Sequence, residues 1–453
     1  MRTLSFNSHV SLTPLAKNEE MEAAEPRGIA DQVAMLLGPD STNFLRAAVE
    51  AVGGKLISSR PRQVYQQPRA GVIASYDTRV RWGDRSPTAE TFAACTGDIP
   101  NGTLVVDDGA DRVAVWRFPN DPDLPGLPSA FSAASVARLL SELELGDGPV
   151  RLSVRAYRPR RRAVVEAIGP SGRLFVKAVR PHRVEALHDR HRLCVASDVP
   201  VPHSLGWNAN GLLVLQALPG ATLREAIRSG RRTLPTGESI IGLLDRLPST
   251  LATGPSRSSW LERVQHYATV VGSIMPTDAE RARRIADAIR DEAGVGPTVA
   301  VHGDLYESQL LVNGSTLCGL LDIDGAGPGD RLDDLGCVLG HLSVLAEVDR
   351  KHAGAINALG ADYLASFEKT VDPVDLRYRT AAVVMSLVAG PHRVQDPRWP
   401  AATLRLIGLA DQWLATARKL RGVSVRQISS AAHDHLTPAA HTGLNSPQQR
   451  STT

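Results

Sequence analysis

The sequence of 453 residues predicts an α+β protein of more than one domain, and three observations support this prediction. Residues 150–179 contain three consecutive strand-like segments joined by short turns, and a helical segment follows them. Residues 221–436 are mainly helical, with one β-hairpin near the middle. Residues 31–148 mix helical and strand-like patterns. Strands grouped before helices, rather than alternating with them, indicate an α+β architecture with antiparallel pairing at its start.

The composition is that of an ordinary folded chain, with 43% hydrophobic and 22% charged residues, which excludes global disorder and a fibrous architecture. A net charge of +3 is too near neutral to indicate a nucleic-acid partner. The longest apolar run, Ala381–Gly390, is half of the ~20 residues that span a bilayer, so no membrane partner is expected. The four cysteines form no CxxC pair, which is typical of a cytoplasmic protein without a disulfide framework.

Changes in composition divide the chain into five parts. Residues 1–30 and 437–453 are polar without periodicity, and we expect a disordered leader and a disordered tail. Residues 31–148 form a predicted N-terminal cap domain, which ends at a Gly/Pro-rich break. Residues 149–220 form a predicted β-rich lobe. Residues 221–436 form a predicted helical lobe.

The elements expected in the two lobes follow from periodicity and turn residues. In the β-rich lobe, the predicted strands and helix are 150–157, 163–168, 173–179, a helix at 181–196, and a strand at 212–216. In the helical lobe, the predicted helices are 223–229, 239–251, 260–274, 278–292, 334–347, 353–367, 376–388 and 402–420, with a β insertion at 299–324.

The segment VHGDLYESQLLVNGSTLCGLLDIDGAGPGDRLDDL, which starts at Val301, carries the strongest functional signal. Asp304 and Asp322 flank a hairpin whose turn is Asn313-Gly314, so the two carboxylates are brought toward each other. Gln309 adds an amide oxygen at the start of the first strand. Two carboxylates and an amide supply hard oxygen ligands for Mg²⁺ and leave one acid free to accept a proton. Phosphoryl transfer requires this set of groups.

The sequences HGDLYESQ and LLDIDGAGPGDRLDDL resemble the paired signatures of the aminoglycoside phosphotransferase family, the small-molecule branch of the protein-kinase-like fold. The resemblance covers about residues 150–420. It implies a bilobal protein-kinase-like fold with an antiparallel β N-lobe, a mainly helical C-lobe and ATP between them. The extra α+β cap domain is similar in size to that of maltokinase-like sugar kinases.

Carried over residue by residue, the resemblance implies a role for five positions. Asp304 is the implied catalytic base, and His302 supports its loop. Asp322 and Gln309 are the implied Mg²⁺ ligands, and Asp334 braces the loop by capping or hydrogen bonding. The family pattern has Asn where this chain has Gln309. Gln keeps the carbonyl ligand but adds a methylene, and maltokinases also carry Gln there.

Lys177 lies on the third strand of the β-rich lobe, where the family places its phosphate-binding lysine. Taken alone, a lysine on a strand is equally compatible with a side chain that points to solvent. The resemblance implies a carboxylate partner on the helix that follows, and we expect Glu185, with Asp189 one turn further as the alternative.

The turn between the first two strands stands where the family has a glycine-rich loop, yet it contains no glycine. Arg160, Arg161 and Arg162 could bind ATP phosphates by charge instead, or could form a solvated basic turn. The segment from Gln216 to Leu218 matches the hinge between the lobes, where backbone groups would bind adenine.

These observations predict an ATP- and Mg²⁺-dependent phosphotransferase with a small-molecule hydroxyl acceptor: a sugar, an amino sugar, an aminoglycoside or a similar polyol. The alternative is a kinase-like module that binds nucleotide with little or no turnover, which Gln309 and the missing glycine loop motivate. A protein kinase is disfavoured because HGD replaces HRD and no APE motif follows.

Overall fold

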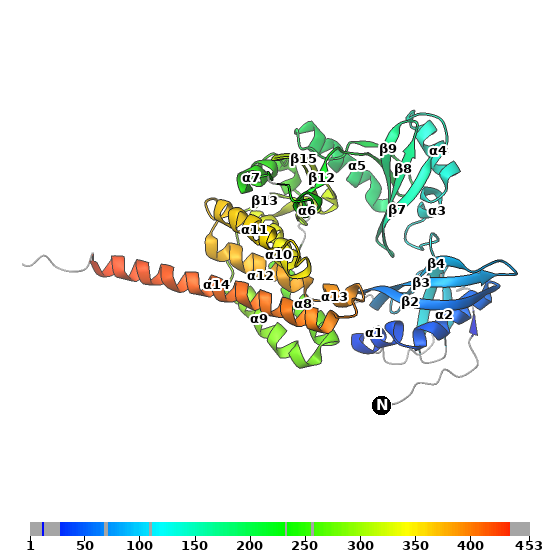
Figure 1. The fold of residues 1–453 in the computed structure, drawn as a ribbon, viewed down its shortest axis with the longest axis horizontal. Coiled ribbons are helices and arrows are strands. Elements are labelled where there is room, and N and C mark those ends of the chain that lie inside the picture. The colour runs from blue at the N-terminus through cyan, green and yellow to red at the C-terminus, as the bar shows by residue number, and fades with distance from the viewer. Residues whose placement is uncertain are drawn as a thin grey trace, which may run out of the picture.

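The computed structural model describes residues 11–12, 28–67, 71–107, 111–231, 233–254 and 258–434. These residues form an N-terminal cap, a β-rich N-lobe and a helical C-lobe, which is the mixed α+β architecture of a kinase-like fold with an added domain (Figure 1). Among the described residues, no helix has the length and apolarity needed to cross a membrane.

The cap is a six-stranded antiparallel sheet with two helices on one face (Figure 1). Its strand order is β1-β5-β6-β4-β3-β2. Phe44 of α2 packs edge-on against Tyr76 of β3 at the centre of its apolar core. The elements are α1 (Ile29–Leu37), α2 (Asp40–Ala51), β1 (Ser11–Leu12), β2 (Gly54–Gln67), β3 (Gly71–Trp82), β4 (Thr88–Cys95), β5 (Leu104–Asp107) and β6 (Arg112–Arg117).

The prediction of a disordered leader over residues 1–30 is wrong where the structure describes it. Ser11 and Leu12 pair with Asp107 and Val106 of β5, and helix α1 begins at Ile29. Backbone hydrogen bonds to a sheet edge hold a polar segment in place even when it has no hydrophobic periodicity. The rest of the leader and the predicted tail lie outside the described residues.

The N-lobe is a five-stranded antiparallel sheet of order β10-β11-β9-β8-β7. Two short helices that precede it in the chain pack on one face of the sheet, and helix α5 packs on the other. The elements are α3 (Leu127–Ala130), α4 (Ala133–Glu142), β7 (Arg151–Arg158), β8 (Arg162–Gly169), β9 (Gly172–Val179), α5 (Pro181–Ala196), β10 (Ser204–Trp207) and β11 (Leu212–Gln216).

The hydrophobic cores place the boundary between the cap and the N-lobe earlier than the break at 146–149 suggested. Leu127 of α3 and Leu139 of α4 share a core with Val165 and Val214 of the N-lobe sheet, and not with the cap. The predicted boundary at 148 therefore cuts off two helices from the lobe that buries them. Composition alone did not show this, because a Gly/Pro-rich segment also occurs inside a domain as a loop.

The C-lobe combines helices with two small antiparallel β pieces that carry the loops of the site. These pieces are β12 (Ala221–Thr222), β14 (Leu310–Asn313) and β15 (Thr316–Leu320) in one sheet, and β13 (Thr298–Val301) with β16 (Gly327–Asp330) in the other. The helices are α6 (Leu223–Arg228), α7 (Gly237–Asp245), α8 (Trp260–Ile274), α9 (Ala279–Glu292), α10 (Arg331–Val348), α11 (Ala353–Phe367), α12 (Pro373–Leu387), α13 (Gly390–Arg393) and α14 (Trp399–Asp434).

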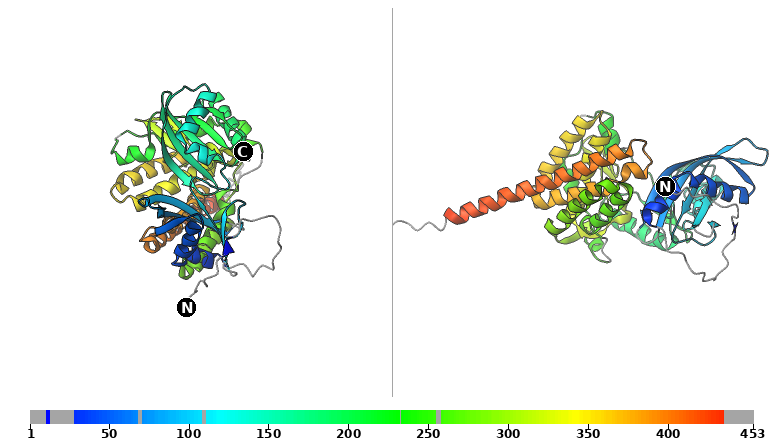
Figure 2. Two further views of the ribbon diagram at one scale, coloured as in Figure 1. Left: turned by 90° about the vertical axis from the view of Figure 1, so that its right-hand side faces the viewer. Right: turned by 90° about the horizontal axis from the view of Figure 1, so that it is seen from below.

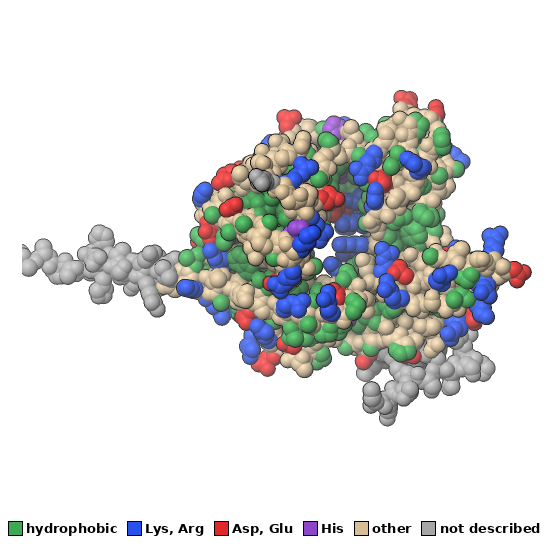
Figure 3. All heavy atoms as spheres, viewed as in Figure 1, with side chains coloured by type: hydrophobic (Ala, Val, Ile, Leu, Met, Phe, Trp, Pro, Cys, Tyr) green, Lys and Arg blue, Asp and Glu red, His purple; other side chains and the backbone are tan. Residues whose placement is uncertain are grey.

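The cap lies beside both lobes. Helix α13 of the C-lobe packs near β2 of the cap, and Gln66 of β2 donates to the Ser273 hydroxyl of α8 at 3.0 Å. On its other side, the cap meets the turn between β7 and β8 of the N-lobe. Helix α14 runs away from this assembly (Figure 2). The molecule is hollowed between cap, N-lobe and C-lobe, and Lys and Arg side chains gather in the hollow (Figure 3).

Candidate active site

The loop that follows β13 is held by a buried carboxylate. The backbone N–H groups of His302 and Gly303 donate to Asp334 of α10 at 2.7 and 2.8 Å. Asp334 is 0% exposed, and burial raises its pKa. Two charge-assisted hydrogen bonds to a buried acceptor make a rigid connection, so α10 fixes the backbone that leads into Asp304.

His302 completes the support of this loop. Its Nε2 lies 2.8 Å from the carbonyl oxygen of Leu321, which can only accept, so Nε2 carries the proton. Its Nδ1 accepts from the backbone N–H of Asp304 at 3.3 Å. The imidazole therefore joins the Asp304 loop to the strand end just before Asp322.

Lys177 points from β9 of the N-lobe to two carboxylates of the C-lobe. Its Nζ lies 3.1 Å from Asp322 Oδ1 and also pairs with Asp324 Oδ1. Arg162 of β8 contacts the same two residues, at 2.7 Å from Asp322 Oδ2 and 3.4 Å from Asp324 Oδ2. Lys177 is only 5% exposed, so its charge is desolvated and needs these partners. Two cations of one lobe thus face two anions of the other.

Asp322 has the electrostatics of a carboxylate that stays ionised. Burial acts to raise its pKa, but Lys177 and Arg162 outweigh burial and hold the pKa well below the usual range. Its backbone adopts the left-handed region at φ 58°, which is uncommon for a residue with a side chain. A strained, ionised carboxylate in a cleft is a feature of functional sites.

The side chain of Gln309 lies next to Asp322. Its side chain is 7% exposed, and its Nε2 lies 3.5 Å from Asp322 Oδ2. An amide and a carboxylate thus converge from the two sides of the β14–β15 hairpin. Both offer the hard oxygen atoms that Mg²⁺ prefers, and the residues present therefore fit that ion.

Helix α5 does not supply the predicted partner of Lys177. Glu185 and its alternative Asp189 are both exposed, and the ammonium pairs across the lobes instead. The buried face of α5 is formed by Val184, Leu187, His191 and Cys194. Glu185 follows Val184 by one residue, about 100° around the helix, and so points away from the sheet. The prediction that Glu185 binds Lys177 is wrong for this structure.

Arg190 of α5 makes the contact that sequence reasoning missed. Its Nη1 donates to the backbone carbonyl of Asp324 at 3.0 Å, so the helix is joined to the loop that carries both acids. Asp324 was missed as well, although it follows Asp322 by two residues in LLDIDG.

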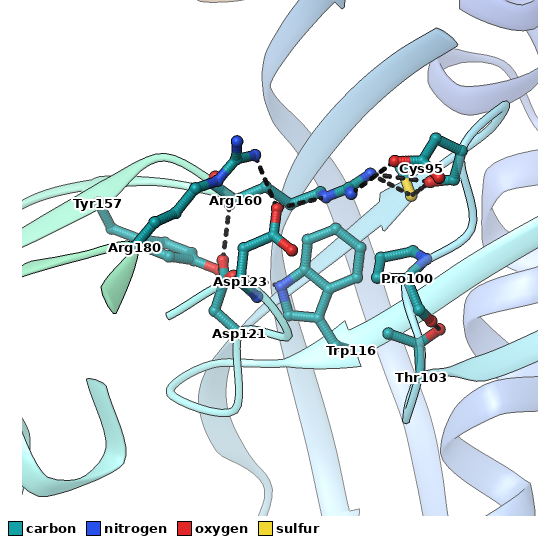
Figure 4. A network of polar contacts seen from close by, with 10 residues as sticks. Cys95, Pro100, Thr103, Trp116, Asp121, Asp123, Tyr157, Arg160 and Arg180 are labelled. Atoms are coloured by element: carbon teal, nitrogen blue, oxygen red, sulfur yellow. Dashed lines mark hydrogen bonds and ion pairs between the residues drawn. The ribbon is translucent and has the colours of Figure 1, made fainter. Parts of the chain in front are cut away.

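The turn between β7 and β8 does not present all its arginines to the cleft. Arg161 is exposed, whereas Arg160 is 6% exposed and turns toward the cap (Figure 4). The Arg160 guanidinium contacts Asp98 Oδ2 at 3.1 Å and Asp123 Oδ2 at 3.0 Å. The expectation that Arg160 binds phosphate is therefore not met. Arg162 is the arginine of this turn that reaches the acids of the site.

The hinge between the lobes lies at the end of β11. The Gln216 side chain is exposed, and its backbone N–H donates to the carbonyl of His203 at 2.9 Å. Leu218 lies close to Gly319 of β15, where a side chain in place of the glycine hydrogen would meet Leu218 Cδ1 at 3.0 Å. The hinge thus connects the N-lobe sheet to the hairpin that carries Gln309.

A second group of side chains surrounds Asp304 on the side of the C-lobe helices. Tyr306 and His341 stack with ring centroids 4.3 Å apart. Burial lowers the pKa of Arg393, and the charge of Arg158 lowers it further, whereas Asp304 acts in the opposite direction. Within the described part of the chain, neither Arg158 nor Arg393 forms an ion pair.

Comparison with known proteins relates part of this chain to a known family. Residues 157–370 match the model of the phosphotransferase enzyme family, and the match includes Lys177, Asp304, Gln309 and Asp322. The fold is that of the kinase-like phosphotransferases. This part of the chain is therefore similar to the phosphotransferase enzyme family. The comparison with curated proteins found no match.

Several solved structures are similar in part. An apo thermostable mutant of aminoglycoside phosphotransferase APH(4)-Ia is 13% identical, covers 61% of this chain and 97% of its own, and has a TM-score of 0.44. A choline/ethanolamine kinase family protein from Mesorhizobium loti is 18% identical, with 59% and 92% covered and a TM-score of 0.43. Because these scores are below 0.5, only the family match over residues 157–370 bears on the class of the protein.

Proposed function

We propose that this protein transfers the γ-phosphate of ATP to a hydroxyl group of a small molecule. The observation that carries the proposal is the meeting of Lys177, Asp322 and Gln309 between the lobes. Asp304 lies on the loop that the His302 ring joins to the carbonyl of Leu321, next to Asp322. Cations of the N-lobe and carboxylates of the C-lobe are the two halves of a phosphoryl-transfer site. The family match supports the same reaction class.

The cations that now bind Asp322 are the proposed phosphate ligands. Lys177 and Arg162 come from adjacent strands, since Val164 pairs with Lys177 in the β8–β9 register. Their charges would hold the α- and β-phosphates of ATP, with Arg162 adding two parallel N–H donors. Asp322 and Gln309 would hold Mg²⁺, which neutralises phosphate charge during transfer.

Asp304 is the proposed base. Its loop is fixed on both sides, by Asp334 through the preceding backbone and by the His302 ring. A carboxylate held in this way would orient the acceptor hydroxyl and accept its proton as the phosphate transfers. The acceptor would lie toward Tyr306 and His341, away from Lys177.

The charge around Asp304 bears on the class of acceptor. Burial raises the pKa of Tyr306 and the charge of Arg158 acts to lower it, and the charge of Arg393 interacts with Tyr306 and Asp304. Neither arginine has an ion-pair partner among the described residues. Two free guanidinium groups repel a polycation and attract a carboxylate or phosphate. We therefore favour a neutral or anionic sugar or polyol over an amino sugar or an aminoglycoside.

A turnover assay tests this proposal. Purified protein is given Mg-ATP and a panel of sugars, sugar acids, sugar phosphates, amino sugars and aminoglycosides, and ADP release is measured with and without each acceptor. We expect at least one acceptor to raise ADP release, and Asp304→Asn to lower that rate by about 10²- to 10⁴-fold. Asp411→Asn is the control, because Asp411 forms an exposed ion pair with Arg281 on the helical lobe.

The alternative is a module that binds nucleotide without turnover. It predicts an affinity for Mg-ATP in the wild type and no acceptor-dependent ADP release from any compound. Equal turnover by the wild type and Asp304→Asn would contradict the assignment of the base. Failure to bind nucleotide at all would contradict both readings.

A further inference from the structure

The turn that replaces a glycine-rich loop has an unusual residue at its strained position. The Arg161 N–H donates to the Arg158 carbonyl at 3.0 Å, so residues 158–161 form a tight turn. Pro159 occupies its second position and Arg160 its third, with φ 61° at Arg160. A turn with Pro followed by a positive φ normally has Gly or Asn at that third position. An arginine there calls for a compensating interaction.

The cap supplies that interaction through the Arg160 side chain (Figure 4). Arg160 Nη1 donates to the Asp98 carbonyl at 2.8 Å, and Nη2 contacts the Asp98 carboxylate at 3.1 Å. Asp98 follows strand β4 of the cap. Arg160 Nε donates to Asp123, in the connector after the cap sheet, at 3.0 Å. The guanidinium thus uses all three of its nitrogen atoms on groups outside the N-lobe sheet.

The backbone of the turn is held by residues of the connector and of the N-lobe. Asp121 Oδ2 accepts from the Arg160 N–H and from the Tyr157 hydroxyl, each at 2.8 Å. Trp116 of cap strand β6 donates to that hydroxyl at 3.0 Å. Arg180 donates to the Arg160 carbonyl at 3.1 Å. The N–H, the carbonyl and the side chain of Arg160 are therefore all engaged.

The other side of the turn faces the phosphate site. Arg158 and Arg162 are directly paired in the β7–β8 register, so their side chains lie on the same face of the sheet. Arg162 reaches Asp322 from that face at 2.7 Å. The residue between them that turns toward the cap is Arg160. One short turn therefore connects the cap to the proposed nucleotide site.

We infer that the cap holds this turn in the place of a glycine-rich loop, with Arg160 as the positioning residue that sets Arg162 against the nucleotide phosphates. The effect on nucleotide rests on the proposed function, whereas the effect on the turn does not. A flexible glycine loop approaches phosphate through its backbone. This turn would present a guanidinium instead, and a neighbouring domain would keep it in position.

Two substitutions in the full chain test the inference. Arg160→Gly suits the positive φ at this position, so the turn can keep its shape, but it removes every side-chain contact with the cap. Arg160→Lys keeps the charge but loses the fork of donors. Amide hydrogen exchange is measured over residues 155–165, together with affinity for the Mg²⁺ complex of a non-hydrolysable ATP analogue. Steady-state KM for ATP and for the acceptor are measured where turnover is found.

We expect Arg160→Gly to speed exchange across the turn, weaken analogue binding by at least about fivefold, and raise the KM for ATP more than the KM for the acceptor. For Arg160→Lys, the exchange rate, the analogue affinity and the KM for ATP should lie between those of Arg160→Gly and the wild type. Arg281→Ala, which breaks an exposed ion pair on the helical lobe, is the matched control and should change none of these values.

Two results would overturn the inference: unchanged exchange in the turn, or wild-type analogue affinity with a turn that exchanges faster. If Arg160→Gly does not fold, Asp98→Ala replaces it, since the Asp98 side chain is 69% exposed and its loss leaves the core intact. Absence of analogue binding to the wild type would count against the proposed function, and the exchange data would still decide whether the cap holds the turn.

Discussion

The charged side chains of the proposed site form ion pairs between the two lobes. Asp322 accepts from Lys177 and Arg162, and both cations also contact Asp324. With Mg-ATP bound, Asp322 would exchange these partners for the metal, and the cations would turn to the phosphates. The same residues thus stabilise the free protein and serve the proposed reaction.

Asp322 should make the stability of the free protein depend on acid pH. Its pKa in the folded protein lies below the value of about 3.9 for an unfolded chain. The unfolded state therefore binds the proton first, so this contribution is present above about pH 4 and is lost as the pH falls further. Urea unfolding between pH 6 and pH 3 should show a larger loss of stability for the wild type than for Asp322→Asn.

Asp333 has the opposite effect on the pH dependence of stability, and both the wild type and Asp322→Asn contain it. Burial raises its pKa to about 6, so its contribution to stability falls as the pH rises from about 4 to 6. The contribution of Asp333 therefore cancels when the free energies of unfolding of the wild type and Asp322→Asn are subtracted at each pH. Identical pH dependence in the two proteins would show that Asp322 is not the ionised, paired group described here.

At the element scale, α5 is joined to the site by a different residue from the one that the family resemblance suggested. Arg190 of this helix, rather than Glu185, contacts the loop that carries Asp322 and Asp324. The Arg190 guanidinium is partly desolvated, and burial lowers its pKa. The position of α5 is therefore coupled to the Asp322–Asp324 loop through a backbone carbonyl and not through Lys177.

Substitutions on α5 should separate these two arrangements. Glu185→Ala removes an exposed side chain and should leave turnover and nucleotide affinity within about twofold of wild type. Arg190→Ala should weaken nucleotide binding by about tenfold, because a charged hydrogen bond contributes about 1.5 kcal/mol. Titration of both variants with the non-hydrolysable ATP analogue measures the effect. If Glu185→Ala lost nucleotide affinity and Arg190→Ala did not, Glu185 would be the functional partner of Lys177 after all.

For the whole molecule, the cap, the N-lobe and the C-lobe meet around a hollow in which Lys and Arg side chains gather (Figure 3). The N-lobe faces the C-lobe through the pairs of Lys177 and Arg162, and the cap contacts both lobes through Arg160 and Gln66. A ligand that binds both lobes adds contacts that the unfolded chain lacks, so it should stabilise the assembly.

Nucleotide should therefore raise the thermal unfolding temperature. At about 100 times Kd, a ligand adds about 2.7 kcal/mol to the folded state, which corresponds to a shift of several degrees. Asp304→Asn should keep this shift, because Asp304 is assigned to the acceptor, whereas Lys177→Met should lose most of it. Differential scanning fluorimetry with and without Mg-ADP makes the comparison. An equal shift in Lys177→Met would remove Lys177 from the nucleotide site.

The sequence by itself determined most strands and helices of both lobes and the segments that carry Lys177, Asp304, Gln309 and Asp322, because local periodicity and motif spacing are properties of short stretches of chain. It did not predict β10, β16 or α13, which are short and have little periodicity of their own. Only the tertiary structure decided which way each charged side chain points. The left-handed backbone at Arg160 turns its guanidinium to the cap, and the rotation of α5 exposes Glu185. Both outcomes depend on groups far away in the sequence, whose burial and charge select one partner among several.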